Sequence, residues 1–500
     1  MRFSAFAVLA AAILLCAPMS RAQEVDATVP TYHADEARTG HYVVRGLTWA
    51  RAAGFRRDPN FDGRVPGHVY AQPLYWRPAG AARGLVIVAT EDNVVVALDA
   101  VTGRTVWQTR LGPAVPLSKL ECGNIDPLGV TGTPVIDERK GALYLDAMID
   151  GGKGPRHLVF GLSLADGRLL PGWPVDTADT LRALGTVFNA PDQGERGALV
   201  LAGEKLYVPY GGHFGECGDY RGWVVGFNLD KPAAFAVWKT PVKMAGIWAP
   251  GGIAFDGRRL FVAVGHSLND FEQWNGANSV IRLPLDLSWR PEPADFFAPT
   301  DWYELNLRYY VLAYNNPLAI DLPGGGPSSA LLFALDKNGK AYLLDRTNLG
   351  GLGHPLLAQQ AGAPGLLANT SPVAWRVGGD MRVAFAGFTS TFPGAVAGGD
   401  VTALDISGGA HPAIKTAWRA NLYGQGAPIV TTSDATADPI VWILGAEGDQ
   451  KLHGFRGDTG QEIFTSGKLD GLRHYVTILA AAGRLYFAGD GQIYAFGPAP

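Results

Sequence analysis

The sequence predicts an all-β protein, and three observations lead to this prediction. The 500 residues include 65 glycines and 34 prolines but only 18% charged residues, a composition typical of large β proteins with many tight connections. Short runs of β-branched and apolar residues recur along the chain. Polar turns that contain glycine join many of these runs in pairs, as hairpins require.

The N-terminal residues predict a secretory signal peptide. Arg2 supplies the positive charge, residues 5–16 are apolar, and residues 20–22 (Ser-Arg-Ala) form a small-x-small cleavage site. The apolar stretch is too short for a transmembrane helix. We therefore expect residues 1–22 to be removed. Residues 23–500 would then form one exported domain, periplasmic or secreted, in a bacterium.

Removal of Cys16 with the signal peptide leaves two cysteines, Cys122 and Cys217. An oxidising compartment favours a disulfide between them. Two free, buried thiols are the alternative that the sequence leaves open.

A repeated unit organises the mature chain. Each unit contains a pair of strands joined by a polar turn, as in residues 132–147, 197–211, 251–265 and 475–490. A third strand and a return strand follow. Four strands at a spacing of some tens of residues are typical of a propeller blade. Third strands are expected at 94–99, 158–164, 223–229, 279–285, 341–346, 400–406, 452–457 and 493–497.

This count predicts a single β-propeller with eight blades. The last unit ends after its third strand, so a segment within residues 42–55 is expected to supply the missing strand and close the ring. Closure would remove an exposed sheet edge. A seven-bladed ring is the alternative, because residues 287–330 are irregular.

One stretch of the chain resembles a known repeat. Residues 97–107 (ALDAVTGRTVW) fit the pattern A-x-D-x-x-T-G-x-x-x-W, with Asp99 and Gly103 in the turn and Trp107 on the return strand. This pattern resembles the repeat of quinoprotein-like β-propellers, which bind or are related to binders of pyrroloquinoline quinone (PQQ). Residues 32–40, 69–75, 122–137 and 220–228 are similar to segments of the same family.

The resemblance implies an alcohol dehydrogenase-like propeller fold and two kinds of activity. The family contains PQQ-dependent alcohol and glucose dehydrogenases, and also non-catalytic propellers such as an outer-membrane assembly factor. The family's alcohol dehydrogenases place PQQ on a disulfide between adjacent cysteines, and this chain has no Cys-Cys pair. It also has no C-x-x-C-H motif for a covalently attached haem.

The long connections predict which face of the ring carries function. Residues 112–130, 174–195, 212–222, 266–277 and 287–316 are all expected to join second to third strands or to lead into the next blade. Such connections share one face of a propeller. Binding residues concentrate on loops that a rigid scaffold holds, so we expect the ligand on this loop-rich face. Cys122 and Cys217 both map to it.

Residues that directly precede first strands are expected to face the axis at the same end. These residues include an arginine, a tryptophan and a histidine with amide partners, which could hold a planar anionic ligand such as PQQ. A water-filled channel with satisfied polar groups is the alternative. The residues are Gln72, Thr131, Arg196, Trp248, Gln425 and His474, of which all but Thr131 are our cofactor-binding candidates.

One loop is rich in the oxygen ligands that a hard cation prefers. Residues 265–278 contain Asn269 and Asp270, our candidates for binding Ca²⁺ or a lanthanide, and Asp270 is also our candidate catalytic base. A solvated polar loop is the alternative. Other oxygen ligands occur in this loop and in a second cluster: Glu272, Asn275, Asn278, and Glu121, Asn124 and Asp126.

Two functional hypotheses follow. The first is a non-catalytic binding or scaffold module whose loop-rich face meets a protein or glycan. The alternative is a periplasmic PQQ- and metal-dependent dehydrogenase of alcohols or sugars. A net charge of −4 without a basic run argues against nucleic acid as a partner. We expect a monomer without a membrane span.

Overall fold

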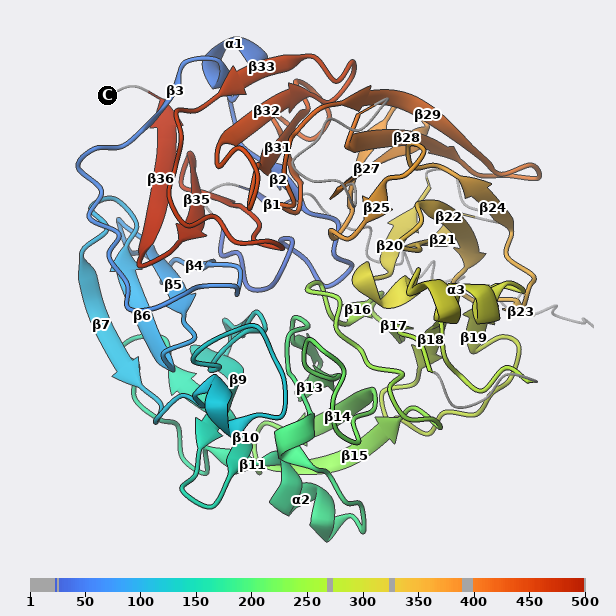
Figure 1. The fold of residues 1–500 in the computed structure, drawn as a ribbon. Coiled ribbons are helices and arrows are strands. Elements are labelled where there is room, and N and C mark those ends of the chain that lie inside the picture. The colour runs from blue at the N-terminus through green and yellow to red at the C-terminus, as the bar shows by residue number, and fades with distance from the viewer. Residues whose placement is uncertain (1–22, 25–26, 268–272, 323–328, 389–398, 499–500) are drawn as a thin grey trace, which may run out of the picture.

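The chain forms a ring of eight β-sheets around a central axis (Figure 1). The computed structural model describes residues 23–24, 27–267, 273–322, 329–388 and 399–498. The first strand of each blade lies nearest the axis and the last strand at the rim, as β7 shows in Figure 1. The prediction of an eight-bladed propeller is therefore confirmed. No helix within the described ranges is long and apolar enough to cross a membrane.

The first four blades follow the chain in order from the axis outward. Blade 1 contains β4 (Leu74–Trp76), β5 (Leu85–Ala89), β6 (Val94–Asp99) and β7 (Thr105–Arg110). Blade 2 contains β8 (Val135–Asp137), β9 (Ala142–Asp150), β10 (Pro155–Ser163) and β11 (Val175–Asp176). Blade 3 contains β12 (Val200–Ala202), β13 (Lys205–Tyr210), β14 (Trp223–Asn228) and β15 (Ala233–Lys239). Blade 4 contains β16 (Ala254–Phe255), β17 (Leu260–Val264), β18 (Ser279–Leu283) and β19 (Phe296–Ala298).

The other four blades complete the ring. Blade 5 contains β20 (Leu318–Asp321), β21 (Ala330–Leu335), β22 (Lys340–Asp345) and β24 (Leu357–Gln360). Blade 6 contains β25 (Leu367–Ala368), β26 (Val373–Val377), β27 (Asp380–Phe388), β28 (Val401–Ser407) and β29 (Ala413–Ala420). Blade 7 contains β30 (Ile429–Thr432), β31 (Ile440–Leu444), β32 (Leu452–Arg456) and β33 (Glu462–Thr465). Blade 8 contains β34 (Leu479–Ala481), β35 (Arg484–Gly489), β36 (Gln492–Pro498) and β3 (Phe55–Arg57).

A few short elements lie outside this plan. Strand β1 (Gln23–Glu24) pairs with β2 (His41–Val43), and β23 (Gly351–Leu352) pairs in parallel with β19 at the rim of blade 4. The helices are α1 (Trp49–Ala52), α2 (Thr177–Ala183), α3 (Trp302–Arg308) and the single-turn 3₁₀ helices η1 (Leu117–Lys119), η2 (Ala190–Asp192) and η3 (Leu312–Tyr314).

The repeat motif builds the contact between neighbouring blades. Asp99 Oδ1 accepts hydrogen bonds from the backbone N–H of Val101 and Thr102, which shapes the turn after β6. The indole of Trp107 donates to the carbonyl of Leu164 in blade 2 at 2.9 Å. Trp418 donates in the same way to Gly457 of blade 7 at 2.9 Å. These residues are structural, as the recurrence of the motif predicts.

The N-terminal segment closes the ring as expected, but with a later strand. Strand β3 pairs antiparallel with β36, and Phe55, the last residue of the predicted range 42–55, lies opposite Pro498. The closing strand continues to Arg57. Strand β2, which the same range overlaps, instead pairs in parallel with β30 at the axial edge of blade 7.

The path from β2 back to residue 28 fills one end of the central channel. This channel segment (residues 28–44) is hydrogen-bonded to every blade, at a residue within its first strand or at most two positions before it, except in blade 6, where the residue lies in β26. The eight partner residues are Tyr75, Ile136, Leu199, Phe255, Ala319, Ala374, Val430 and Thr477.

Arg38 anchors the channel segment. Its buried side chain donates to the carbonyl oxygens of Leu199 and Ile253, both at 3.0 Å, and to Thr31 Oγ1 at 2.6 Å. Burial lowers the pKa of Arg38 to about 10, so the guanidinium remains charged at neutral pH. The segment therefore closes the channel through polar contacts that reach across the ring.

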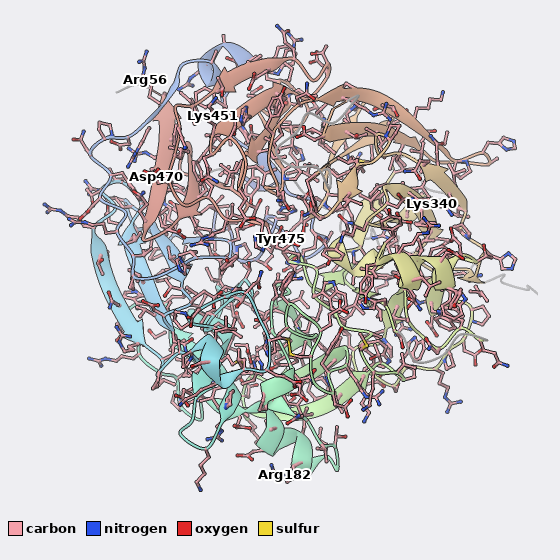
Figure 2. The ribbon with its side chains drawn as sticks, viewed as in Figure 1. Arg56, Arg182, Lys340, Lys451, Asp470 and Tyr475 are labelled. Atoms are coloured by element: carbon pink, nitrogen blue, oxygen red, sulfur yellow. A yellow bond between two sulfur atoms is a disulfide. The ribbon has the colours of Figure 1, made fainter. Side chains whose placement is uncertain are left out.

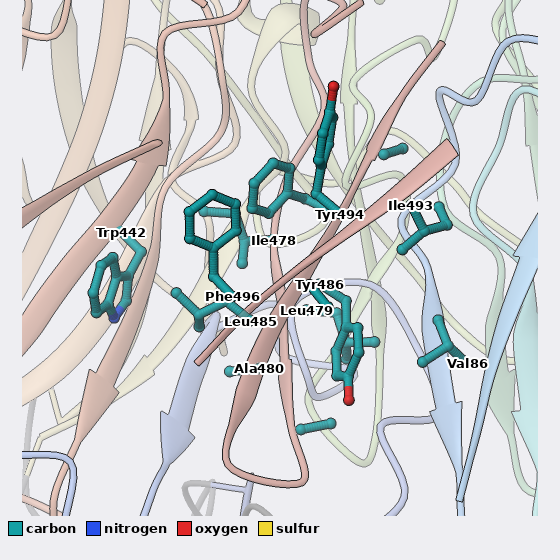
Figure 3. Close-up of a cluster of buried hydrophobic side chains, with 14 of the residues drawn as sticks. Val86, Trp442, Ile478, Leu479, Ala480, Leu485, Tyr486, Ile493, Tyr494 and Phe496 are labelled. Atoms are coloured by element: carbon teal, nitrogen blue, oxygen red, sulfur yellow. The ribbon is translucent and has the colours of Figure 1, made fainter. Parts of the chain in front are cut away.

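The hydrophobic core lies between the blades. Figure 3 shows one cluster in which Val86 of blade 1 and Trp442 of blade 7 lie on either side of blade 8, the sheet that contains Tyr486 and that β3 completes. Similar clusters fill the spaces between other blades. Burial of this kind is the main favourable contribution to folding of the ring.

One predicted connection is divided between the two faces. The range 287–316, expected on the loop-rich face, contains the fourth strand β19. Residues 284–295 join the third to the fourth strand of blade 4 and so lie on the opposite face, whereas residues 299–317 lead to blade 5 on the loop-rich face. The irregular sequence concealed this short strand.

Candidate functional site

A cavity of about 640 Å³ lies on the axis, which we call the axial basin. Its walls come from residues before first strands, such as Arg196 and His474, and from connections between second and third strands, such as the loop with Glu216. Both classes of connection belong to the loop-rich face. Tyr475, which lines the basin, lies near the centre of the ring in Figure 2, whereas Arg182 lies at the rim.

Four of the five predicted cofactor-binding residues meet in this basin. Arg196, Trp248, Gln425 and His474 all line it. Gln72 does not: it is buried, and its side-chain oxygen accepts the backbone N–H of His33 at 3.0 Å. Gln72 therefore holds the channel segment in place, because that segment occupies the part of the axis that Gln72 faces.

Two cations in the basin have no acidic partner. Arg196 Nε donates to the carbonyl of Trp248 at 2.8 Å, and its guanidinium carbon lies 5.1 Å from the centre of the Tyr475 ring. Lys337 Nζ lies 4.2 Å from the centre of the Tyr314 ring. Among the residues that the structure describes, neither cation has a carboxylate within ion-pair distance. Each is held by an aromatic ring and left available to an anion.

Burial affects Lys337 directly. The pKa of Lys337 is lowered, because burial disfavours the ammonium more strongly than nearby Glu216 favours it. An anionic ligand beside Lys337 would stabilise the ammonium and so replace the hydration that burial removes. The geometry thus favours binding of negative charge.

The carboxylates of the basin are already paired with histidines. Glu216 Oε2 lies 2.7 Å from Nε2 of the buried His266, and Glu447 Oε1 lies 2.6 Å from Nδ1 of His474. Burial opposes ionisation of Glu447, but the hydrogen bond and the charge of His474 outweigh it and lower the pKa of Glu447. His474 is therefore oriented by Glu447.

Three residues that carry much of this arrangement were not predicted. Lys337 and Glu216 lie in connections between second and third strands, and Tyr475 directly follows the predicted His474. Only residues before first strands were considered as candidates for the axis. The four-strand pattern could have identified them, because the loops between second and third strands lie on the same face of the ring as the residues before first strands.

The metal-binding prediction is not tested. Asn269 and Asp270 lie outside the described residues. Among those described, no three His, Cys, Asp or Glu side chains converge so as to hold a metal ion. Two other candidates have structural contacts: Asn278 donates to Asn306 Oδ1 at 2.5 Å, and Asp126 Oδ1 accepts the Leu117 N–H at 2.9 Å.

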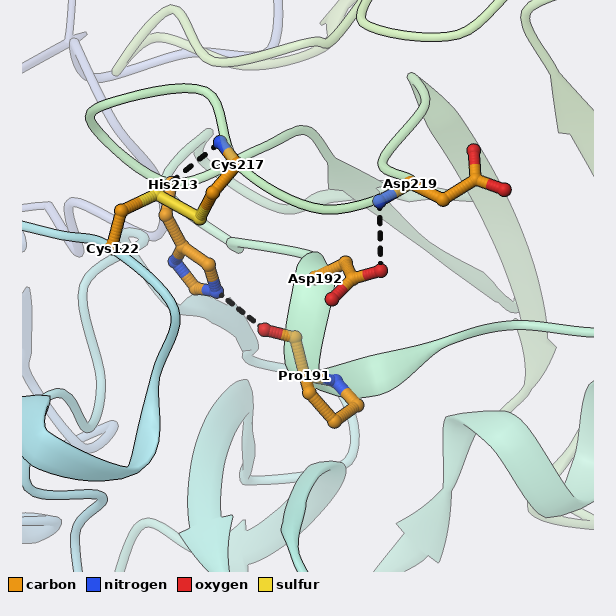
Figure 4. The surroundings of a disulfide bond; sticks show 6 residues. All are labelled: Cys122, Pro191, Asp192, His213, Cys217 and Asp219. Carbon is orange, nitrogen blue, oxygen red and sulfur yellow. Dashed lines mark hydrogen bonds between the residues drawn. A yellow bond between two sulfur atoms is a disulfide. The ribbon is translucent and has the colours of Figure 1, made fainter.

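The predicted disulfide is present. Cys122 and Cys217 are bonded, with a Cα–Cα distance of 6.0 Å (Figure 4). The bond ties the connection between β7 and β8 to the loop between β13 and β14. Below it, His213 Nε2 lies 3.0 Å from the Pro191 carbonyl oxygen, a contact drawn in Figure 4. Since His213 lines the axial basin, the disulfide fixes part of its rim.

Comparisons with known proteins agree on the architecture. Residues 51–207 match the family model described as outer membrane protein assembly factor BamB. The quinohemoprotein alcohol dehydrogenase of Comamonas testosteroni is similar in structure, with a TM-score of 0.61 and 16% identity over 95% of this chain and 81% of that one. No curated protein matches the chain in sequence.

Two further solved structures give the same result. The quinohemoprotein alcohol dehydrogenase ADHIIG of Pseudomonas putida HK5 has a TM-score of 0.62 and 14% identity, over 95% of this chain and 82% of that one. A europium-containing methanol dehydrogenase has a TM-score of 0.62 and 13% identity, over 94% of this chain and 98% of that one. With the repeat motif and the eight blades, these matches show that the chain has the β-propeller fold of the quinoprotein alcohol dehydrogenases, and that its residues 51–207 resemble the family model.

Proposed function

We propose that this chain is an exported, monomeric binding module that holds a planar, anionic aromatic molecule in the axial basin. One observation carries the proposal: Arg196 and Lys337 present two cations, neither paired with a carboxylate of the described residues, in a cavity walled by aromatic rings. Carboxylates of a ligand would pair with these cations, and its ring would contact Trp248 or Tyr475.

PQQ fits the organic part of this site. It is planar and carries carboxylates, which Arg196 and Lys337 could bind, and the volume of about 640 Å³ lies in the range of small-molecule pockets. If bound, PQQ would supply a quinone that accepts electrons. The described residues supply no complete metal-ligand set beside it.

The family supports a binding role as well. The model that matches residues 51–207 is described as an outer membrane protein assembly factor. The loop-rich face around the basin is where we expect a protein or glycan partner. Export rests on the predicted signal peptide of residues 1–22, which N-terminal sequencing of the mature protein would test.

Calorimetric titration of the mature protein with PQQ tests the proposal, in the presence and absence of Ca²⁺ or La³⁺. We expect binding of one molecule, weakened about tenfold or more, equivalent to about 1.4 kcal/mol, by Arg196→Gln or Lys337→Gln. Arg57 and Lys205 also lie over aromatic rings, at 4.7 and 4.2 Å, but outside the basin. Arg57→Gln and Lys205→Gln are therefore matched controls that should bind normally.

Two outcomes would change the conclusion. Binding of PQQ that ignores both basin substitutions would place the ligand elsewhere. Dye-linked oxidation of an alcohol or sugar by the PQQ-loaded protein would establish the alternative, a quinoprotein dehydrogenase. In that case the residues 268–272 would become the first place to search for the metal ligands and the base.

A further inference from the structure

A second, smaller cavity lies beside the axial basin, beneath the loops that the disulfide ties together. This side chamber has a volume of about 50 Å³. One water occupies about 10–15 Å³ on this measure, so the chamber has room for about three to five non-hydrogen atoms. Leu120, Ile125, Leu128 and Met148 give it an apolar side.

Glu195 forms part of the polar side of the chamber. The residue is 6% exposed, and among the described residues the Gly132 N–H is the one donor near its carboxylate, in a geometry too poor for a normal hydrogen bond. Gly132 lies against it so closely that a β-carbon built there would be 2.2 Å from Oε2. A buried carboxylate with so few donors is costly, so a group that supplies further donors at this position would be bound favourably.

The surroundings of Glu195 are rich in acceptors. Glu91 is buried as well, and only its Oε2 accepts a hydrogen bond, from the Gly129 N–H at 2.7 Å. Asp146 is already satisfied, because Oδ1 lies 2.6 Å from His157 Nδ1 and Oδ2 accepts the Tyr210 hydroxyl at 2.9 Å. Of these three carboxylates, Glu195 has the fewest donors.

Among the described residues, no basic group forms an ion pair with Glu195. Arg196 lines the chamber, but it forms no ion pair with Glu195, and its Nε is directed to the Trp248 carbonyl. His213 also lines the chamber, and burial lowers its pKa to about 4, so that it is neutral at pH 7. His157 is paired with Asp146. A ligand that balances Glu195 must therefore bring its own positive charge.

We propose that the side chamber binds a short primary ammonium ion of one to three carbons, with the ammonium at Glu195 and the alkyl group against Leu120, Ile125 and Leu128. The ammonium would donate to both carboxylate oxygens, and the small volume excludes longer chains. This inference does not rest on binding of PQQ in the axial basin, because Glu195 does not line that basin.

The test is calorimetric titration of the full mature protein with ethylammonium chloride, and with ethanol as a neutral molecule of the same shape. We expect one ethylammonium to bind, and ethanol to bind at least about tenfold more weakly. Glu195→Gln should weaken ethylammonium binding by at least about tenfold and should still fold, since it removes a buried charge. Leu120→Trp, which fills the apolar side, should abolish binding without altering the carboxylate.

Two controls separate this site from the rest of the molecule. Glu204 is an exposed carboxylate in a turn of blade 3, so Glu204→Gln should leave ethylammonium binding unchanged. Lys337→Gln should weaken PQQ binding but not ethylammonium binding, since Lys337 lines only the basin. Equal affinity for ethanol, or binding that Glu195→Gln does not affect, would overturn the proposal. Failure of ethylammonium to bind at millimolar concentrations would overturn it too.

Discussion

The indole ring of Trp107 lies directly against Gly167 in the next blade, so closely that a β-carbon built on Gly167 would be 2.5 Å from ring atom Cε3. Trp418 has the same relationship to Gly460, where the distance would be 2.6 Å. In each pair the tryptophan of one blade packs on the turn between the third and fourth strands of its neighbour. The tryptophan of the repeat motif therefore requires a glycine in the turn of the next blade, in addition to shaping its own blade.

Gly167→Ala should destabilise the ring more than the same substitution at a glycine of similar positive φ that has open space around it. Gly203 provides the control, because its φ of +66° is similar to the +72° of Gly167 and nothing lies within 4 Å of its added β-carbon. We expect Gly203→Ala to lower the free energy of unfolding by about 1 kcal/mol. Gly167→Ala should cost a further 1–3 kcal/mol, roughly, through overpacking against the indole. Chemical denaturation measures both, and equal losses would show that the indole moves aside easily.

Arg38→Met should destabilise the propeller although it keeps the length of the side chain. The substitution leaves the carbonyl oxygens of Leu199 and Ile253 buried without donors. We expect a loss of about 3 kcal/mol or more in the free energy of unfolding. Arg168→Met, in an exposed turn of blade 2, is the control and should have no measurable effect. A stable Arg38→Met variant would mean that packing alone holds the channel segment.

His157 should make stability depend on pH. Burial alone would lower its pKa, but the charge and hydrogen bond of Asp146 outweigh burial and raise it. Its stabilising contribution is therefore fully present below the ordinary value of 6.5 and is lost as pH rises through the raised pKa of the folded state. The free energy of unfolding should therefore vary less with pH in this range for His157→Gln than for wild type. The exposed His411→Gln should behave like wild type.

Glu195→Gln should stabilise the protein at neutral pH when no ligand is bound. Burial, and then the charge of Asp146, raise the pKa of Glu195 well above 4.5. An acid with a raised pKa contributes most stability below its unfolded value of 4.5, and loses it as pH rises toward the folded pKa. Glutamine stays neutral, so the gain should be seen at pH 7 and vanish below pH 4.5. Denaturation at both pH values tests this, and a destabilised variant at pH 7 would contradict it.

The fold could be predicted because the repeat is local. Each hairpin and each turn, such as the one at Asp99 and Gly103, is encoded within a few residues, and eight copies determine the ring. The closing strand depends instead on a partner more than 400 positions away. The Phe55–Arg57 strand has no alternating apolar pattern, so the sequence does not mark it as a strand. The predicted range of 42–55 therefore includes only its first residue.

The site could be predicted only in part for a related reason. Position relative to the first strands was enough to place Arg196, Trp248, Gln425 and His474 around one cavity. The same rule failed for Gln72, because the channel segment occupies its side of the axis. No pattern in the sequence announced that segment. Its partners are spread over eight blades, so its contacts exist only once the ring is formed.

The channel segment also constrains the order of folding. Its residues are among the first to be synthesised, yet their hydrogen-bond partners extend to Thr477 near the end of the chain. The segment can therefore form its full set of hydrogen bonds only after all eight blades have been synthesised and the ring has closed. Contacts of such long sequence separation are slow to form. A chain that lacks its last blade would leave strand β3 without its partner β36 and the channel segment without its contact to Thr477, so the N-terminal residues can complete their pairing only when the C-terminal blade is present.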